Sequence, residues 1–283
     1  MIKTIGVVGA GVMGNGIAHV FAWHGYDVIL YDVDDSQIAS AMVTIRENLG
    51  RQAKKGIVDS SRINEIMGRI RTTLYLSDLA PVDFVVEAVT ENKSLKVELF
   101  RKLDEIVRED VILASNTSSI PITTLAAVTK RPGQVIGMHF MNPPPVMTLV
   151  EVIRGQATSD ETFATVASLT TTLEKEIALA QDYPGFIVNR ILIPMINEAV
   201  FALFEGVATA EDIDKGMKLG TNQPVGPLAL ADLIGLDTVL AIANVLYEGF
   251  KDQKYRPCPL LVKMVAGGTL GRKTGSGFYT YQD

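Results

Sequence analysis

Short apolar runs alternate with helical patterns through the first two thirds of the chain. Residues 2–8 form an apolar run of strand length, and apolar positions then recur at helical spacing over residues 12–21. Gly25 supplies a helix stop, and a second apolar run covers residues 28–31. A long helical pattern follows over residues 34–55. The chain therefore begins with a strand, a helix, a second strand and a second helix.

The same alternation continues toward the middle of the chain, with a further helix predicted over residues 91–107. The other segments with strand character are residues 72–75, 83–87, 111–115, 135–139, 149–153 and 176–180. Strands that alternate with helices predict an α/β domain with a largely parallel sheet. Ligands of such sheets bind beyond the carboxyl ends of the strands. Polar residues gather at three of these ends, at Glu87, at Ser115–Ser118 and at His139.

The strand signal stops after Tyr183-Pro184-Gly185, which indicates two domains, residues 1–183 and 184–283. Helices are predicted for the second domain over residues 185–205, 210–218, 227–249 and 258–266. The helix 185–205 is apolar around most of its girth, so it must be buried. We expect it to serve a subunit interface as well as an internal core.

The composition favours a folded protein and argues against a nucleic-acid-binding or membrane protein. The chain is 47% hydrophobic with a mean hydropathy of +0.23, which predicts a substantial core, and its net charge of −6 argues against nucleic acid as the main partner. The single cysteine, Cys258, fits a reducing compartment, and the longest apolar region is interrupted by polar and charged residues, which argues against a membrane span. We therefore expect a soluble, cytoplasmic protein, and no spacing of His, Cys and carboxylates suggests a metal site.

The first strand leads into Gly9-Ala10-Gly11-Val12-Met13-Gly14, a pattern typical of dinucleotide sites. Gly9 allows a tight turn, Gly11 lets the backbone approach a pyrophosphate, and Gly14 lets the helix pack closely on the strand. The helix N-terminus then offers N–H groups to the phosphates. Asp32, at the end of the second strand, can accept hydrogen bonds from a ribose diol and would repel a 2′-phosphate, so the pattern favours NAD over NADP.

His139 and Glu151 are a candidate for proton-transfer chemistry. His139 ends a strand, and Glu151 lies 12 residues further on, inside an apolar run where an unpaired carboxylate would be costly. If the two segments are neighbours, Glu151 would hold the imidazole, raise its basicity and make it a base beside the nicotinamide. The alternative is that Glu151 pairs with Arg154 and that His139 is a buried structural ring. His19 and His24, on the first helix, are interpreted as structural.

Six motifs, in order along the whole chain, carry a resemblance to a known family. They are GVVGAGVMGNGIA, DFVVEAVTE, ASNTSS, GMHFMNPPPVMTLVEVI, DYPGFIVNRIL and GRKTGSGFY. Together they resemble the short-form L-3-hydroxyacyl-CoA dehydrogenase family, and most closely its bacterial members that act on 3-hydroxybutyryl-CoA. The resemblance implies a Rossmann-like, mostly parallel NAD-binding domain, followed by an all-helical domain for the substrate cleft and homodimerisation. It also implies reversible, NAD-dependent oxidation of a 3-hydroxyacyl-CoA.

The resemblance implies roles for particular residues. The catalytic pair of the family matches His139 and Glu151, while Ser118 and Asn189 match residues that reach the substrate. Cofactor contacts of the family match Gly9, Ala10, Gly11, Val12, Met13, Gly14, Asp32, Glu91, Lys96, Asn116, Asn142 and Lys273. Contacts to the coenzyme A handle are expected on the helix over residues 34–55, which carries Arg46, Arg51, Lys54 and Lys55. A solvated, charged helix face is the alternative for those cations.

Two other functions share the first motif. One is a β-hydroxyacid dehydrogenase of the hydroxyisobutyrate type, which relies on a lysine in a different motif. The other is an NAD(H)-binding protein without turnover on the same scaffold. The His-Asn-Pro segment and Glu151 favour the acyl-CoA dehydrogenase, while the sequence leaves acyl chain length and physiological direction open.

Overall fold

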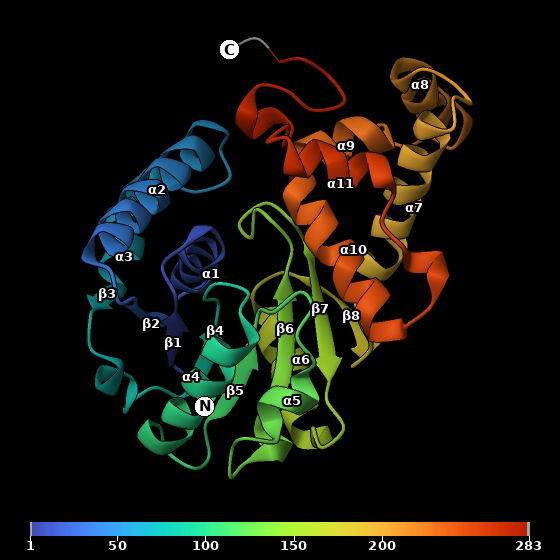
Figure 1. The fold of residues 1–283 in the computed structure, drawn as a ribbon. Coiled ribbons are helices and arrows are strands. Elements are labelled where there is room, and N and C mark those ends of the chain that lie inside the picture. The colour runs from blue at the N-terminus through green and yellow to red at the C-terminus, as the bar shows by residue number, and fades with distance from the viewer. Residues whose placement is uncertain (1, 282–283) are drawn as a thin grey trace. The chain divides into compact units, whose positions relative to one another are not determined.

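The structure, a computed structural model, describes residues 2–281 and divides the chain into two compact units. The first unit comprises residues 1–183 and is built on one eight-stranded sheet, and the second comprises residues 184–283 and is helical (Figure 1).

The sheet of the first unit is parallel except at one pairing. Its strands lie in the order β3-β2-β1-β4-β5-β6-β7-β8, and only the β6–β7 pair is antiparallel among them. Because β1 lies between β2 and β4, the strand order reverses beside it, which creates the crevice where ligands bind in such sheets. The strands are β1 (Thr4–Val8), β2 (Asp27–Tyr31), β3 (Ile70–Thr73), β4 (Phe84–Glu87), β5 (Ile112–Ser115), β6 (Val135–Phe140), β7 (Leu149–Arg154) and β8 (Glu176–Gln181).

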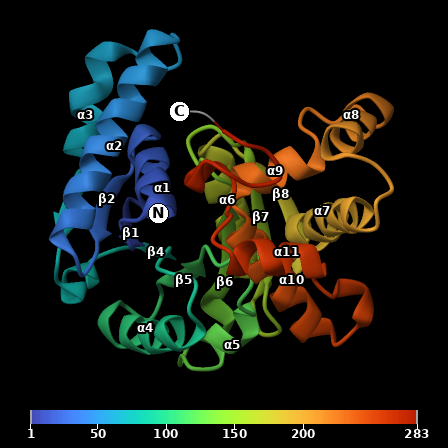
Figure 2. The same cartoon turned by 45° about the horizontal axis from the view of Figure 1, so that its top comes forward.

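Helices cover both faces of this sheet. On one face, buried side chains of α1 and α6, such as Phe21 and Val166, share a core cluster with the strands, and on the other face α4 and α5 lie together (Figure 2). The helices are α1 (Val12–Trp23), α2 (Asp35–Lys54), α3 (Ile63–Gly68), α4 (Lys93–Ile106), α5 (Ile122–Ala126) and α6 (Asp160–Thr172). Short 3₁₀ turns cover Ser60–Arg62, Leu76–Leu79 and Pro132–Gln134.

Local sequence fixes where these helices begin. The Asp34 carboxylate accepts a hydrogen bond from Ser36 N at 2.8 Å and caps α2, and Asn92 caps α4 by accepting from Leu95 N at 3.0 Å. The strand predicted over residues 72–75 is wrong in position. It begins at Ile70 because Ile70 is buried and pairs with Val28 of β2.

The second unit contains the helices α7 (Val188–Phe204), α8 (Ala210–Gly220), α9 (Pro227–Ile234), α10 (Leu236–Phe250) and α11 (Pro259–Ala266). Two 3₁₀ turns, Gln253–Tyr255 and Arg272–Thr274, complete it. The single helix predicted over residues 227–249 is wrong. Gly235, with a φ of +98°, separates α9 from α10, and the two helices are bent by 100°. Ile193, Ile196, Leu228, Leu236 and Leu246 belong to the core that these helices share.

Across residues 2–281, no single helix is long and apolar enough to cross a membrane. One bent pair, α9 with α10, meets the length and composition criteria when the two helices are taken together.

Candidate active site

The glycine-rich loop after β1 leaves room for a pyrophosphate beside the N-terminus of α1. Gly9 has a φ of +102°, its N–H donates to Tyr31 O at 2.7 Å, and an added Cβ would lie 2.7 Å from Ala88 O. A Cβ at Gly14 would overlap the carbonyl oxygen of Gly9, so only glycine lets α1 begin so close to the loop. At Gly11 a Cβ would meet no described atom within 4 Å. The backbone is thus open on the side where a pyrophosphate would approach the helix N-terminus.

Asp32 connects the end of β2 to this loop. Its Oδ2 accepts a hydrogen bond from Ala10 N at 2.7 Å, and its Oδ1 accepts one from Asp34 N at 3.1 Å. The next side chain, Val33, is exposed and carries no charge. A 2′-phosphate at this position would face a carboxylate, whereas a ribose diol could donate to it.

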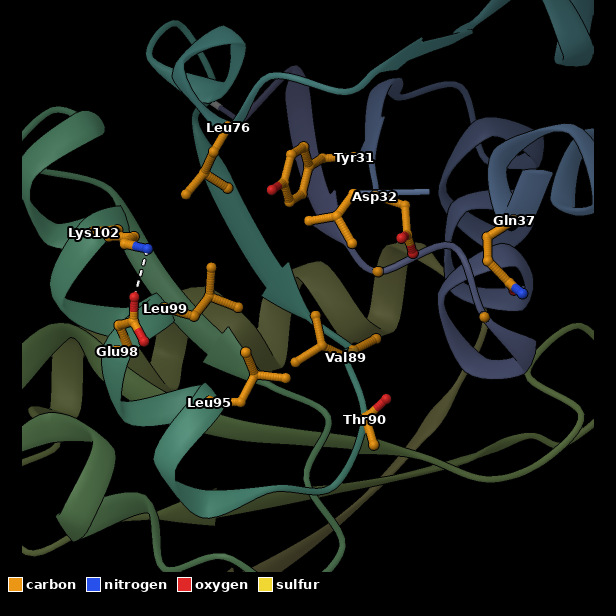
Figure 3. A pocket seen from close by; sticks show the side chains of 14 residues that line it. Tyr31, Asp32, Gln37, Leu76, Val89, Thr90, Leu95, Glu98, Leu99 and Lys102 are labelled. Carbon is orange, nitrogen blue, oxygen red and sulfur yellow. Dashed lines mark ion pairs between the residues drawn. The ribbon is translucent and has the colours of Figure 1, made fainter. Parts of the chain in front are cut away.

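A cavity of about 610 Å³ opens beside the loop and lies within the first unit. Figure 3 shows apolar side chains on its walls, and on its rim Lys102 forms an ion pair with Glu98 at 2.6 Å. The lining residues are Gly9, Gly11, Tyr31, Asp32, Val33, Gln37, Leu76, Ala88, Val89, Thr90, Leu95, Glu98, Leu99 and Lys102. An apolar slot that ends in a carboxylate and a glycine loop suits a flat base, a ribose and a pyrophosphate in succession.

Several of these wall residues were not predicted. Leu95 is a large apolar side chain left exposed on α4, and Leu76 belongs to a 3₁₀ turn. Tyr31 stands directly before Asp32. Burial is the main cause that raises the pKa of the Tyr31 hydroxyl, and the negative charge of Asp32 raises it further. Tyr31 and Asp32 both line the cavity, although successive residues of a strand point to opposite faces, so no clear signal in the sequence marked Tyr31.

His139 and Glu151 meet across the antiparallel pair β6–β7. They are paired in the strand register, and directly opposed residues extend from the same face of a sheet. The ring Nδ1 lies 2.6 Å from Glu151 Oε2, with His139 9% exposed and Glu151 fully buried. When Nδ1–H donates to the carboxylate, the neutral ring has its lone pair on Nε2, which is therefore the atom that can take up a proton.

Arg154, the alternative partner of Glu151, is engaged elsewhere. Its Nη2 lies 2.7 Å from Asp160 Oδ1 and donates to Thr158 O at 2.9 Å. The sequence left both pairings open, and the strand register decides between them in favour of His139.

A second buried ion pair lies at the end of β4. Lys96 Nζ, on α4, lies 2.6 Å from Glu87 Oε1, 3.3 Å from Glu91 Oε2 and 3.1 Å from Val89 O. These three partners occupy the three N–H groups of the ammonium, and Lys96 is only 1% exposed. Ser115, at the end of β5, donates its hydroxyl to Glu87 Oε2 at 2.6 Å. Lys96 is thus placed inside the protein and not on the wall of the cavity.

Glu91 extends this network to the loop after β5. Its Oε1 accepts hydrogen bonds from Thr117 Oγ1 at 2.6 Å, from Ser119 Oγ at 2.7 Å and from Ser118 N at 3.0 Å. Burial acts to raise the pKa of Glu91, but Lys96 and these hydroxyls together bring it below its usual range. Glu91 therefore fixes the backbone of Ser118. In residues 2–281, no group of three or more His, Cys, Asp or Glu is placed to hold a metal ion.

The other predicted cofactor residues of the first unit lie outside the cavity lining. Asn116 is buried, and its Oδ1 accepts a hydrogen bond from Phe140 N at 2.8 Å, which joins the ends of β5 and β6. Asn142 is exposed in the loop that follows β6. Glu91 is also absent from the lining.

The predicted coenzyme A cations lie in the second half of α2. Arg51 donates to Asn48 Oδ1 at 2.7 Å and Arg46 donates to Asn64 Oδ1 at 3.2 Å, while Lys54 and Lys55 are exposed at the helix end. Two predicted residues belong to the second unit. Asn189 is the second residue of α7, and Lys273 forms an ion pair with Asp237 of α10.

Comparison with known proteins identifies the family. The family described as 3-hydroxyacyl-CoA dehydrogenase, NAD binding domain, matches residues 4–183, and its C-terminal domain matches residues 185–281. The chain belongs to the 3-hydroxyacyl-CoA dehydrogenase family. The predicted family, fold class and NAD cofactor are therefore confirmed.

Relatives are similar over the full length. The chain is 53% identical to a 3-hydroxybutyryl-CoA dehydrogenase of Bradyrhizobium diazoefficiens, with 100% of this chain and 96% of the relative covered. It is 42% identical to the human mitochondrial hydroxyacyl-coenzyme A dehydrogenase, with 100% and 92% covered. The crystal structure of an (S)-3-hydroxybutyryl-CoA dehydrogenase from Ralstonia eutropha matches with a TM-score of 0.97 at 52% identity, and both chains are covered completely.

Proposed function

We propose that this chain is an oxidoreductase that converts (S)-3-hydroxybutyryl-CoA reversibly to acetoacetyl-CoA with NAD, in fatty-acid or butanoate metabolism. The observation that carries the proposal is the buried His139–Glu151 pair, 2.6 Å apart, in the sheet that also holds the NAD-type loop. The full-length relatives named 3-hydroxybutyryl-CoA dehydrogenase support the choice of substrate.

The residues of the first unit fit NAD. The open backbone at Gly11, the turn at Gly9 and the carboxylate of Asp32 lie on one cavity with apolar walls. When bound, NAD supplies the hydride acceptor for the carbon that carries the hydroxyl group. Asp32 would accept hydrogen bonds from the ribose and exclude a 2′-phosphate.

His139 is the proposed general base. Its Nε2 takes the proton of the substrate hydroxyl in the oxidation and returns a proton to the carbonyl oxygen in the reduction. Glu151 holds Nδ1 and stabilises the imidazolium that forms. Ser118, fixed through Glu91, and Asn189, near the start of α7, are proposed to hydrogen-bond the substrate and orient it.

The coenzyme A handle is proposed to bind the cations of α2. Arg51 and Lys54 lie in its last turn and Lys55 caps its C-terminal end, and all three are exposed to solvent where they can meet phosphate groups. Glu91, Lys96, Asn116, Asn142 and Lys273 stay proposed cofactor contacts, and for Lys96 the contact would act through its partners Glu87, Val89 and Glu91.

The protein is also proposed to be a cytoplasmic homodimer. The second unit exposes large apolar side chains at Ile191, Phe204, Val207, Leu219 and Leu233. Exposed apolar residues of this number on one small helical unit are typical of a subunit interface. Light scattering coupled to gel filtration would give twice the mass of the 30.6 kDa chain.

A spectrophotometric assay of NADH oxidation tests the function. Acetoacetyl-CoA should be reduced with NADH, and far more slowly with NADPH, because Asp32 repels the extra phosphate. Longer 3-oxoacyl-CoAs, up to C16, would define the chain-length preference. Turnover of free semialdehydes or oxo acids in place of the thioesters would instead indicate a hydroxyisobutyrate-type enzyme. NADH binding without turnover of any of these substrates would contradict the proposal.

A further inference from the structure

The loop over residues 141–148 joins β6 to β7, and its two flanking strands carry His139 and Glu151. Within it, Val146 N and Met147 N both donate to Pro143 O at 3.0 Å, which closes a tight turn. Three consecutive prolines supply no backbone N–H, so few internal hydrogen bonds can fix this turn. Its position must therefore depend on groups outside the loop.

One of those groups is Lys175, the residue before β8. Its Nζ donates to Pro144 O at 2.8 Å and to Met147 O at 2.7 Å, two backbone carbonyls of the loop. Lys175 is half-buried, and this desolvation lowers the pKa of its ammonium. Its hydrogen bonds thus go to backbone carbonyls of one loop, an arrangement that clamps the loop at two points.

A second group is Gly16 of α1, the helix that begins at the glycine-rich loop. A Cβ at Gly16 would lie 2.7 Å from Cδ of Pro144, so α1 and the loop are in direct contact there. Pro144 is buried, whereas the preceding Pro143 is exposed. The turn is therefore seated on α1 through one proline and held by Lys175 through two carbonyls.

The clamp lies where the pairing of β7 begins. Glu176 N, next to Lys175, donates to Thr148 O at 2.9 Å, and Leu149 pairs with Glu176 in the register of β7 and β8. Glu151 is two residues further along β7, opposite His139. A displacement of the turn would therefore shift the start of β7. The Glu151 side chain would move with it, because side-chain direction follows strand register.

We infer that Lys175 is a positioning residue for the proton-transfer pair, and that it acts by clamping Pro144 and Met147 against the seat formed by Gly16. The inference rests on the proposed function for its effect on turnover. Small displacements of reacting groups, of about 1 Å, can lower rates by about a hundredfold. Neither Lys175 nor any residue of the loop over 141–148 lines the cofactor cavity.

The test compares Lys175→Met, which keeps the apolar stem but removes the ammonium, with Lys175→Arg and with Lys130→Met as an exposed control in the same unit. Three quantities are measured well below the melting temperature: kcat with acetoacetyl-CoA, the NADH dissociation constant by fluorescence, and hydrogen exchange of the Val146 and Met147 amides. For Lys175→Met we expect kcat to fall about tenfold or more and both amides to exchange faster. The NADH dissociation constant should change by a smaller factor than kcat, because Asn142 is the only proposed cofactor contact in the loop and the cavity is lined by other residues.

Lys175→Arg should regain a large part of kcat, and Lys130→Met should match the wild type in all three measurements. Wild-type kcat or unchanged exchange in Lys175→Met would overturn the inference. If Lys175→Met does not fold, Gly16→Ala tests the same seat, because its methyl group must displace Pro144 and lower kcat in the same way. Failure of the wild type to reduce acetoacetyl-CoA would refute the proposed function instead, and the exchange rates would still decide whether the clamp exists.

Discussion

Glu87 and Glu151 are both fully buried carboxylates in one sheet, yet their partners differ in kind. Glu87 lies 2.6 Å from the ammonium of Lys96, and Glu151 lies 2.6 Å from the imidazole of His139. Lys96 and Glu87 have further partners in Glu91, Val89 and Ser115, which tie together the ends of β4, β5 and the start of α4. The first pair joins three elements of the sheet unit, and the second is the pair that we propose to exchange a proton.

The partner of a buried carboxylate decides whether the pair can exchange a proton. Burying a carboxylate is costly unless an opposite charge and hydrogen bonds compensate. The lysine donates all three of its N–H groups to fixed partners, whereas an imidazole that donates through Nδ1 can still accept a proton at its other nitrogen. Substitutions at the two sites should therefore separate turnover from stability.

The largest effect is expected for Glu151→Gln. The amide can donate to Nδ1, which would leave the proton on Nε2 and remove the base, so kcat should fall by about 10²–10⁴-fold. NADH binding, measured by fluorescence titration, should change little because the cavity is separate from Glu151. Retention of wild-type kcat would show that this acid is structural like Glu87.

Glu87→Gln should act on stability instead. It leaves a buried ammonium with a weaker partner, and breaking a buried pair in this way costs about 3–5 kcal/mol. We expect a fall in the free energy of unfolding of the first unit of about 3 kcal/mol, because Glu91 still compensates part of the charge. Chemical denaturation measures this change, and equal stability to the wild type would remove the contrast between the two acids.

His19 is another buried titratable group in the first unit, an imidazole with an amide partner. Its Nε2 lies 3.0 Å from Gln52 Oε1, and burial lowers its pKa to about 4. In the unfolded chain, His19 has an ordinary pKa near 6.5. Between pH 6.5 and pH 4 the unfolded chain therefore binds more protons than the folded protein, and the free energy of unfolding decreases as the pH falls through this window. From pH 7.5 to pH 5 this one group should remove about 2 kcal/mol.

Denaturation of the wild type and of His19→Gln at both pH values measures that contribution. The variant should lose less stability on acidification than the wild type does. An identical loss in both proteins would show that His19 does not titrate between the folded and unfolded states as described.

The smallest effect is expected for Arg154→Met. Arg154 pairs with Asp160, whose side chain is 94% exposed, and such pairs contribute about 0–1 kcal/mol. Stability should therefore change by less than about 1 kcal/mol and kcat by less than about twofold. A large loss of kcat, measured in the same assay as for Glu151→Gln, would mean that Arg154 supports Glu151 after all.

The sequence predicted the strands of the sheet unit, but it missed three of that unit's helices, α3, α5 and α6. The strand runs, the glycine loop and Asp32 follow from local patterns, and each lies where its pattern indicated, apart from the shift of β3. The break at Gly235 was missed because apolar residues continue at helical spacing on both sides of it. Spacing alone left Glu151 with two possible partners, because the antiparallel register that decides between them is a long-range property.

The burial of Lys96 and the clamp by Lys175 were equally hidden from the sequence. Lys96 follows Glu91 by five residues and Glu87 by nine, but only the fold brings both carboxylates onto its ammonium. Lys175 reaches carbonyls 31 and 28 residues earlier, and backbone acceptors leave no mark in a sequence. Residues whose partners are backbone atoms or distant strands need the structure.

The most direct test of the central claim is a comparison of His139→Gln with the wild type in two measurements, NADH binding and single-turnover reduction of acetoacetyl-CoA. His24→Gln is the matched control, since that ring lies at the end of α1 and bonds Val20 O at 2.8 Å. We predict unchanged NADH affinity in both variants, with reduction slowed by at least about a hundredfold only in His139→Gln. Reduction at the wild-type rate in His139→Gln would show that His139 is not the general base.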